Sequence, residues 1–149
     1  VVAVSDVHGA ITGFSSIHDV WSHFEKNGNI NVPGSDKLTN EELLHFKADV
    51  LIPAALADAI TEKTAPGIQA KIVVEGANAP TTPEGDAIMK DKGILVVPDI
   101  LANAGGVSEI LNKFGLAPSP TNFDLNSFTL KAIFFSYFGL FIRLHQRFH

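Results

Sequence analysis

The sequence predicts an α/β domain in which a parallel sheet is covered by helices on both faces. Short runs of continuously apolar, β-branched residues recur along the first two thirds of the chain, and segments with helical periodicity separate them. Glycine, proline and asparagine mark the turns between these segments. Strands that are buried on both faces are apolar throughout, and their alternation with helices is typical of a parallel sheet.

The first predicted strand covers residues 1–5, an apolar run that a turn signal ends. A helix follows, with Ser16 as its N-cap and Gly28 at its end. Apolar residues recur in this helix with the spacing of one helical face, namely at Ile17, Val20, Trp21 and Phe24. A short second helix is predicted over residues 39–46, where threonine and asparagine precede two glutamates.

Three further strands are predicted in the next part of the chain, each short and rich in β-branched residues, at residues 49–53, 71–75 and 94–97. A turn of helix near residues 61–65 separates the first two of them. The helix before the last strand has Thr82 as its N-cap, with proline and glutamate directly after it, and extends to about Lys92.

Size and charge limit the classes of function. A chain of 149 residues has the length of one ordinary domain, and its net charge of −5 argues against a nucleic-acid partner. The absence of cysteine excludes disulfides and thiolate metal sites. No signal peptide is recognisable, and because the chain begins inside a predicted strand we expect it to be a fragment.

The composition changes near residue 108, which predicts two parts, 1–107 and 108–149. The second part holds eight of the 11 phenylalanines and includes a Pro/Ser/Asn-rich stretch typical of a linker. Its longest apolar run, residues 132–142, is too short to span a bilayer, which needs about 20 residues. Three interpretations of this tail remain: a non-native extension, a packed terminal helix or an interfacial anchor.

Ligands of an open parallel sheet bind beyond the carboxyl ends of its strands. Small residues dominate at those ends and include Ala54 and Ala55, which leave room for a flat ligand against the backbone. Asn78 and Asn103 each offer an amide that can hold ribose hydroxyls or a carboxamide. Asp6 ends the first strand, where a carboxylate can accept two hydrogen bonds from a ribose diol. These residues predict a nucleotide site, although small residues and asparagine also occur in simple tight turns.

The stretch from Asp6 to Gly9 permits another interpretation, because a strand that delivers Asp-x-His-Gly is also how metal-dependent phosphoesterases present metal ligands. Such a two-metal site needs further carboxylate, asparagine and histidine ligands from other strand ends. No later strand end carries a histidine. We therefore predict no metal site here.

Three segments, "VVAVSDVHGAI", "ADVLIPAAL" and "KIVVEGANAPTTPEGDAIMKDKGILVVPDILANAGGV", closely resemble the cofactor-binding domain of glutamate dehydrogenases, within the wider Glu/Leu/Phe/Val dehydrogenase superfamily. The resemblance covers residues 1–107. It implies a Rossmann-like parallel sheet, here lacking its first strand and the glycine-rich turn after it. It also implies oxidative deamination of L-glutamate to 2-oxoglutarate and ammonia, with hydride transfer to a nicotinamide cofactor.

The resemblance assigns cofactor contacts to six residues and a catalytic role to none. It places Ser5 and Asp6 at the adenosine ribose, Ala54 and Ala55 along the cofactor, Asn78 at the nicotinamide ribose, and Asn103 at the carboxamide. The lysines and the aspartate that act on the amino acid in this family belong to a substrate domain outside the matching segments. We therefore expect this chain to be inactive by itself.

The carboxylate of Asp6 favours NAD, because it repels the 2′-phosphate of NADP, while a protonated His8 nearby softens that repulsion and leaves NADP possible. The family implies a small amino-acid substrate and a homohexameric enzyme, in the cytoplasm or in mitochondria. Two alternatives remain open: a dehydrogenase of the leucine, phenylalanine or valine type, and a non-catalytic nucleotide-binding fragment.

Overall fold

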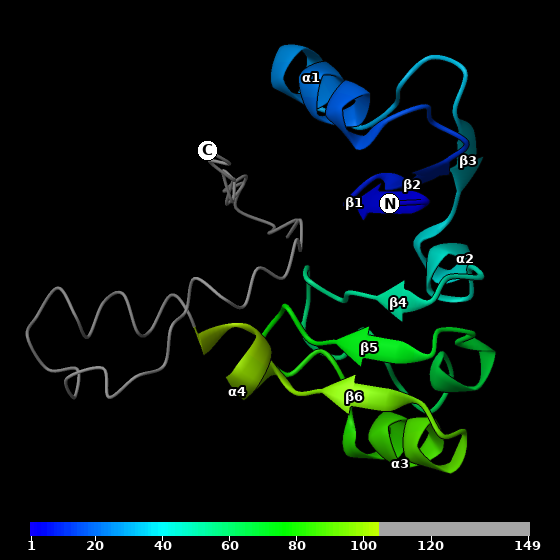
Figure 1. Ribbon diagram of the computed structural model, residues 1–149, viewed down its shortest axis with the longest axis vertical. Coiled ribbons are helices and arrows are strands. Elements are labelled where there is room, and N and C mark those ends of the chain that lie inside the picture. Colours follow the sequence, from blue (N-terminus) through cyan, green and yellow to red (C-terminus); the bar gives the residue numbers. More distant parts are fainter. Residues whose placement is uncertain (105–149) are drawn as a thin grey trace, which may run out of the picture.

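The computed structural model describes residues 1–104, which form two three-stranded sheets with helices against them (Figure 1). The expected boundary near residue 108 lies outside these residues. No helix within residues 1–104 is long and apolar enough to cross a membrane. The elements in chain order are β1 (Ala3–Asp6), β2 (Gly9–Thr12), α1 (Ile17–Asn27), β3 (Asp36–Leu38), α2 (Asn40–Leu44), β4 (Val50–Leu51), the 3₁₀-helix η1 (Ala65–Gly67), β5 (Ile72–Val74), α3 (Pro83–Asp91), β6 (Leu95–Val97) and α4 (Asp99–Ala102).

The second half of the described chain forms the predicted parallel sheet, in the order β4–β5–β6. The three arrows point the same way in Figure 1, and α3 packs beside β6. Val73 in the central strand is fully buried and packs in one cluster with Ile60 and Met89. A Cβ at Gly85 would lie 2.7 Å from the carbonyl oxygen of Ile60, so glycine permits the close approach of α3.

The first strand differs from the expectation, because it does not belong to the parallel sheet. β1 pairs with β2 in an antiparallel hairpin, and β3 pairs with β2 on the other side. Neither β2 nor β3 was predicted from the sequence. A two-residue turn follows Asp6 and gives β1 a partner immediately after it in the chain. Such a turn joins antiparallel strands only, since parallel strands need a crossover of a dozen or more residues.

A separate core lies between this hairpin and α1. Val4, Ile11, Val20 and Ile30 form a buried cluster there. Val20 lies on the apolar face of α1, and the exposed residues of the helix lie on its other side. The two sheets therefore have separate cores, and each is covered by its own helix.

The helix ends follow local signals, as predicted. Ser16 caps α1 by accepting a hydrogen bond from the backbone N–H of His18 at 3.1 Å. Gly28 ends this helix with a φ of 69°, a conformation that costs glycine little. Thr82 caps α3 in the same way, by accepting from the N–H of Gly85 at 3.2 Å. These interactions involve residues two or three apart in the sequence, which is why the sequence alone predicts them.

Candidate functional site

The carboxyl ends of β1 and β4 face a common cavity of about 590 Å³. Ser5, Asp6, Ala54 and Ala55 all line it, so the structure brings together four of the six residues that the sequence predicts. Much of the remaining lining is apolar and includes Leu51, Ile52, Leu56 and Phe24. Pockets of this size with few polar groups are typical of sites for small organic ligands.

Asp6 is half-buried at the edge of this cavity. Its Oδ1 accepts a hydrogen bond from the backbone N–H of His8 at 2.8 Å, which stabilises the turn between β1 and β2. The other carboxylate oxygen has no hydrogen-bond partner within residues 1–104 and can accept from a ligand hydroxyl. The Asp-x-His-Gly stretch is therefore a hairpin turn, and the described residues contain no group of three or more side chains able to hold a metal ion.

The two asparagines that the sequence predicts bind each other. The side-chain N–H of Asn103 donates to the Oδ1 of Asn78 at 2.8 Å, across 25 positions of the sequence. This bond leaves the Nδ2 donor of Asn78 and the Oδ1 acceptor of Asn103 for a ligand. A donor beside an acceptor is the complement of a carboxamide or of a ribose hydroxyl, each of which both donates and accepts.

The loop after β5 carries Asn78 and is fixed at two points. The carbonyl oxygen of Pro53 accepts hydrogen bonds from the N–H groups of Gly76 at 3.0 Å and Ala77 at 2.9 Å. Pro53 also lines the cavity. These two bonds therefore connect the backbone of the Asn78 loop to a residue of the cavity wall. Neither Asn78 nor Asn103 is among the residues that line the cavity.

Asp99 provides the second fixed point and was not among the site residues predicted from the sequence. Its Oδ2 accepts from the N–H of Ala79 at 2.8 Å. Ala79 has a φ of 45°, a left-handed conformation that is unfavourable for any residue with a Cβ. The buried carboxylate of Glu75 in turn accepts from the N–H of Asp99 at 3.1 Å. Glu75 is the last residue of the predicted strand 71–75, and Asp99 lies two residues beyond the predicted strand 94–97, which was the signal available in the sequence.

Comparisons with known proteins support a family assignment. The family model for glutamate/leucine/phenylalanine/valine dehydrogenase matches residues 1–111. The glutamate dehydrogenase of Thermotoga maritima is 52% identical over 112 residues, which are 72% of this chain and 27% of that protein. An NAD-specific glutamate dehydrogenase of Halobacterium salinarum is 48% identical over 110 residues, covering 72% and 25%. The NADP-specific enzyme of Saccharolobus shibatae is 47% identical over 111 residues, covering 72% and 26%.

Solved structures agree with this assignment. A leucine-bound, hetero-hexameric glutamate dehydrogenase from Thermus thermophilus superimposes with a TM-score of 0.66 and 32% identity over 80% of this chain and 30% of its own. Glutamate dehydrogenase from Peptoniphilus asaccharolyticus gives a TM-score of 0.54 at 31% identity, over 77% and 27%. The chain thus spans about a quarter of the length of the curated relatives that it matches.

Proposed function

This chain belongs to the glutamate/leucine/phenylalanine/valine dehydrogenase family, and we propose that it forms part of the cofactor-binding domain of an NAD(P)-dependent glutamate dehydrogenase. The reaction of the whole enzyme is the oxidative deamination of L-glutamate to 2-oxoglutarate and ammonia. Glutamate is the substrate we favour because the relatives that are 47% to 52% identical are named glutamate dehydrogenases.

The observation that carries this proposal is the arrangement of the strand ends. Asp6 and the two alanines at residues 54 and 55 line one cavity. Asn78, on the loop after β5, is bonded to Asn103, at the end of the helix α4 that follows the neighbouring strand β6. An extended ligand with a ribose at one end and a carboxamide at the other fits these groups chemically. A nicotinamide dinucleotide is such a ligand.

In this proposal the cofactor supplies the hydride acceptor, and the residues of this chain bind and orient it. The free carboxylate oxygen of Asp6 accepts a hydrogen bond from the adenosine ribose. Asn78 donates toward the nicotinamide ribose, while Asn103 accepts from the carboxamide and so determines which ring face meets the substrate. We propose NAD as the preferred cofactor, because the charge of Asp6 opposes a 2′-phosphate; the names of the relatives include both NAD- and NADP-specific enzymes.

Catalysis in this proposal needs other parts of the enzyme. The chain spans about a quarter of its relatives, and we propose that a substrate domain supplies the residues that bind and deprotonate the amino acid. We also propose that the sheet lacks its first strand and the glycine-rich turn that binds the pyrophosphate. The isolated chain is then inactive and binds nucleotide weakly, and the whole enzyme assembles as a hexamer.

An NMR titration of the ¹⁵N-labelled chain tests the proposed site, since it detects weak binding. We expect NAD to shift the side-chain amide signals of Asn78 and Asn103 and the backbone signal of Asp6. The Asn103→Ala variant should lose most of the shift at Asn78, because the Asn78 side chain is no longer held. Asn31→Ala is the matched control, since Asn31 is exposed and lies outside the cavity.

Two outcomes would contradict the proposal. If millimolar NAD shifts no signal of these three residues, the chain does not carry the nucleotide site. If the isolated chain oxidises glutamate above background, residues outside this chain are not required for catalysis. A stronger response to NADP than to NAD would overturn the cofactor preference alone.

A further inference from the structure

We propose that Glu75 is a positioning residue, whose buried carboxylate holds Asn78 and Asn103 where they bind each other. Asp99 transmits this effect to both asparagines. The inference rests on the proposed function, because that function places the asparagine pair at the nicotinamide end of the cofactor. It goes further by naming a residue that acts on this end of the site through another residue.

Glu75 differs from the other acids of residues 1–104, because it is the one charged side chain that is buried, with 8% of its surface exposed. Burial of a charged carboxylate is costly. Within these residues Glu75 forms no ion pair, and its side chain accepts one hydrogen bond, from the N–H of Asp99 at 3.1 Å. The stability of the fold alone therefore does not explain a carboxylate at this position.

The carboxylate of Glu75 takes the place of a missing cap on α4. Pro98 occupies the N-cap position of this helix and makes no side-chain hydrogen bond to it. The first N–H groups of a helix have no partner within the helix, and Glu75 accepts the N–H of Asp99. The backbone N–H of Glu75 itself donates to the carbonyl oxygen of Val97 at 3.0 Å, beside the pairing of β5 with β6. Glu75 thereby attaches α4 to the parallel sheet.

Asp99 connects this anchor to both asparagines. On one side its Oδ2 accepts from the N–H of Ala79, the residue after Asn78. On the other side its carbonyl oxygen accepts from the N–H of Asn103 at 2.9 Å, across the single turn of α4. The bond from Asn103 to Asn78 at 2.8 Å closes this ring of contacts. A displacement of Asp99 therefore moves both asparagines.

The Asn78 loop needs such an anchor because its backbone is strained. Within residues 1–104, the non-glycine residues with positive φ are Ala79 at 45° and Asp58 at 53°. The N–H of Asp58 donates to the carbonyl oxygen of Ala79 at 3.1 Å, so the two strained residues lie together. Strained residues persist only where their surroundings hold them, and they cluster at ligand sites. Without the anchor we expect Ala79 to relax and Asn78 to leave its position.

A purely electrostatic role for Glu75 is the alternative that the test has to separate. The nicotinamide ring of NAD is positively charged, so a carboxylate near it would attract the ring without positioning anything. Glu75→Gln distinguishes the two roles, because its amide oxygen still accepts the N–H of Asp99 although the charge is gone. Glu75→Met removes both the acceptor and the charge, and its similar size limits the formation of a cavity.

Hydrogen exchange of the backbone amides in the full chain, measured without nucleotide, tests the anchor. Glu75→Met should accelerate exchange at Ala79, Asp99 and Asn103 by roughly fivefold or more, which is the effect of losing one net hydrogen bond. Glu75→Gln should keep these amides within about twofold of wild type, because the hydrogen bond is retained. Exchange in β1 and β2 should not change in either variant, since these strands belong to the other sheet.

A titration of the ¹⁵N-labelled chain with NAD then tests whether the anchor serves the cofactor. In Glu75→Met the side-chain amide signals of Asn78 and Asn103 should lose most of their NAD-induced shift. The backbone signal of Asp6 should keep its shift, because Asp6 lies in β1 of the other sheet. Glu75→Gln should restore the response of both asparagines.

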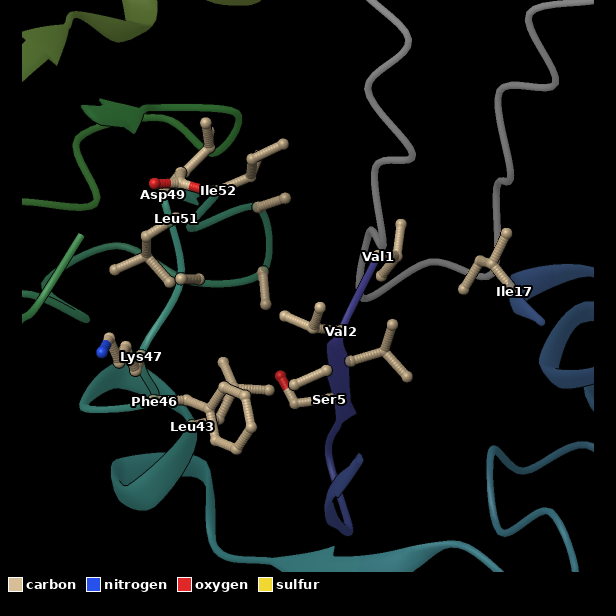
Figure 2. A pocket seen from close by; sticks show the side chains of 16 residues that line it. Val1, Val2, Ser5, Ile17, Leu43, Phe46, Lys47, Asp49, Leu51 and Ile52 are labelled. Carbon is tan, nitrogen blue, oxygen red and sulfur yellow. The ribbon is translucent and has the colours of Figure 1, made fainter. Parts of the chain in front are cut away.

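Asp49→Asn is the matched control, since it also removes a carboxylate next to a strand of the parallel sheet. Asp49 directly precedes β4 and pairs with Lys71 at 2.7 Å. Figure 2 shows it beside an apolar groove of about 460 Å³ between β1 and β4, and no residue of α4 lines this groove. Asp49→Asn should leave exchange at Ala79 and Asn103 as in wild type.

Three results would overturn the inference. The first is exchange at Ala79 and Asn103 that Glu75→Met leaves unchanged or that Asp49→Asn accelerates equally. The second is a Glu75→Gln variant that behaves like Glu75→Met, which would assign the role to the charge. The third is unfolding of the whole chain by Glu75→Met, or an equal loss of the NAD response at Asp6, which would make Glu75 a general structural residue. If NAD shifts no signal of the wild-type chain, the proposed cofactor site fails, and the exchange measurement still decides whether Glu75 holds the asparagine pair.

Discussion

Replacing Asp99 by alanine should weaken both the fold and the candidate site. The Asp99 carboxylate accepts the N–H of Ala79 at 2.8 Å and that of Ile100, the next residue, at 2.6 Å. The first bond holds Ala79 at its positive φ, and the only other backbone bond to Ala79 among the described residues comes from the N–H of Asp58. Loss of the carboxylate therefore removes one of the two points at which the loop that carries Asn78 is fixed.

The size of the effect follows from these contacts. A hydrogen bond to a charged group contributes about 1.5–3 kcal/mol to stability. Asp99 is half-buried and Ala79 is exposed, so water replaces part of the lost bond and we expect a loss of about 1–2 kcal/mol for Asp99→Ala. The left-handed conformation of Ala79 costs about 1 kcal/mol relative to glycine, so Ala79→Gly should stabilise the chain by about that amount.

Urea denaturation of the full chain measures both changes, and the side-chain amide signal of Asn78 reports on the loop. Asp91→Ala is the control, because Asp91 is exposed and makes no side-chain hydrogen bond or ion pair within residues 1–104. If Asp99→Ala unfolds within about 0.5 kcal/mol of the Asp91→Ala control, the usual range for surface substitutions, and the Asn78 signal does not move, Asp99 does not hold the loop.

Other substitutions test the packing and the charges. Lys92→Met should cost about 1–2 kcal/mol in a urea titration, because the Lys92 ammonium donates to three backbone carbonyl oxygens in and beside η1. Gly85→Ala should lower the melting temperature although alanine favours helices, since its Cβ would lie 2.7 Å from the carbonyl oxygen of Ile60. Lys71 lowers the pKa of the Asp49 carboxyl through a 2.7 Å ion pair, so the pair stabilises the fold above the usual pKa of 3.8 and its effect is lost below it. Lys71→Gln should therefore be less stable than wild type at about pH 6, and the difference should vanish toward about pH 2.

The strands of the parallel sheet and the helices α1 to α3 were predicted from the sequence, whereas α4 was not. The segments around β4, β5 and β6 were recognised as strands from their apolar, β-branched runs, and α1 and α3 from their periodicity and caps. The segment of β1 was also recognised, but its partner was not, because residues 9–12 have no strong strand pattern of their own. Their pairing with β1 arises from the turn after Asp6, which the apolar pattern does not reveal.

The sequence predicted which residues at the strand ends belong to the candidate site, but not how those residues are arranged in space. The structure brings four of the six residues to one cavity and bonds the other two to each other. Their contacts with a cofactor remain predictions. Asp99 and Glu75 were recognisable as acids at the ends of strands. Their role depends on the backbone conformation of Ala79, which cannot be predicted from its residue type.

The sequence by itself determined the helices α1 to α3, the apolar strands and the family, because caps, periodicity and short motifs act between residues a few positions apart. Only the tertiary structure decided which strands pair, that Asn78 meets Asn103 across 25 positions, and that β1 and β4 face each other across an apolar groove. Those contacts join segments far apart in the chain, and their energies depend on how the segments pack against one another.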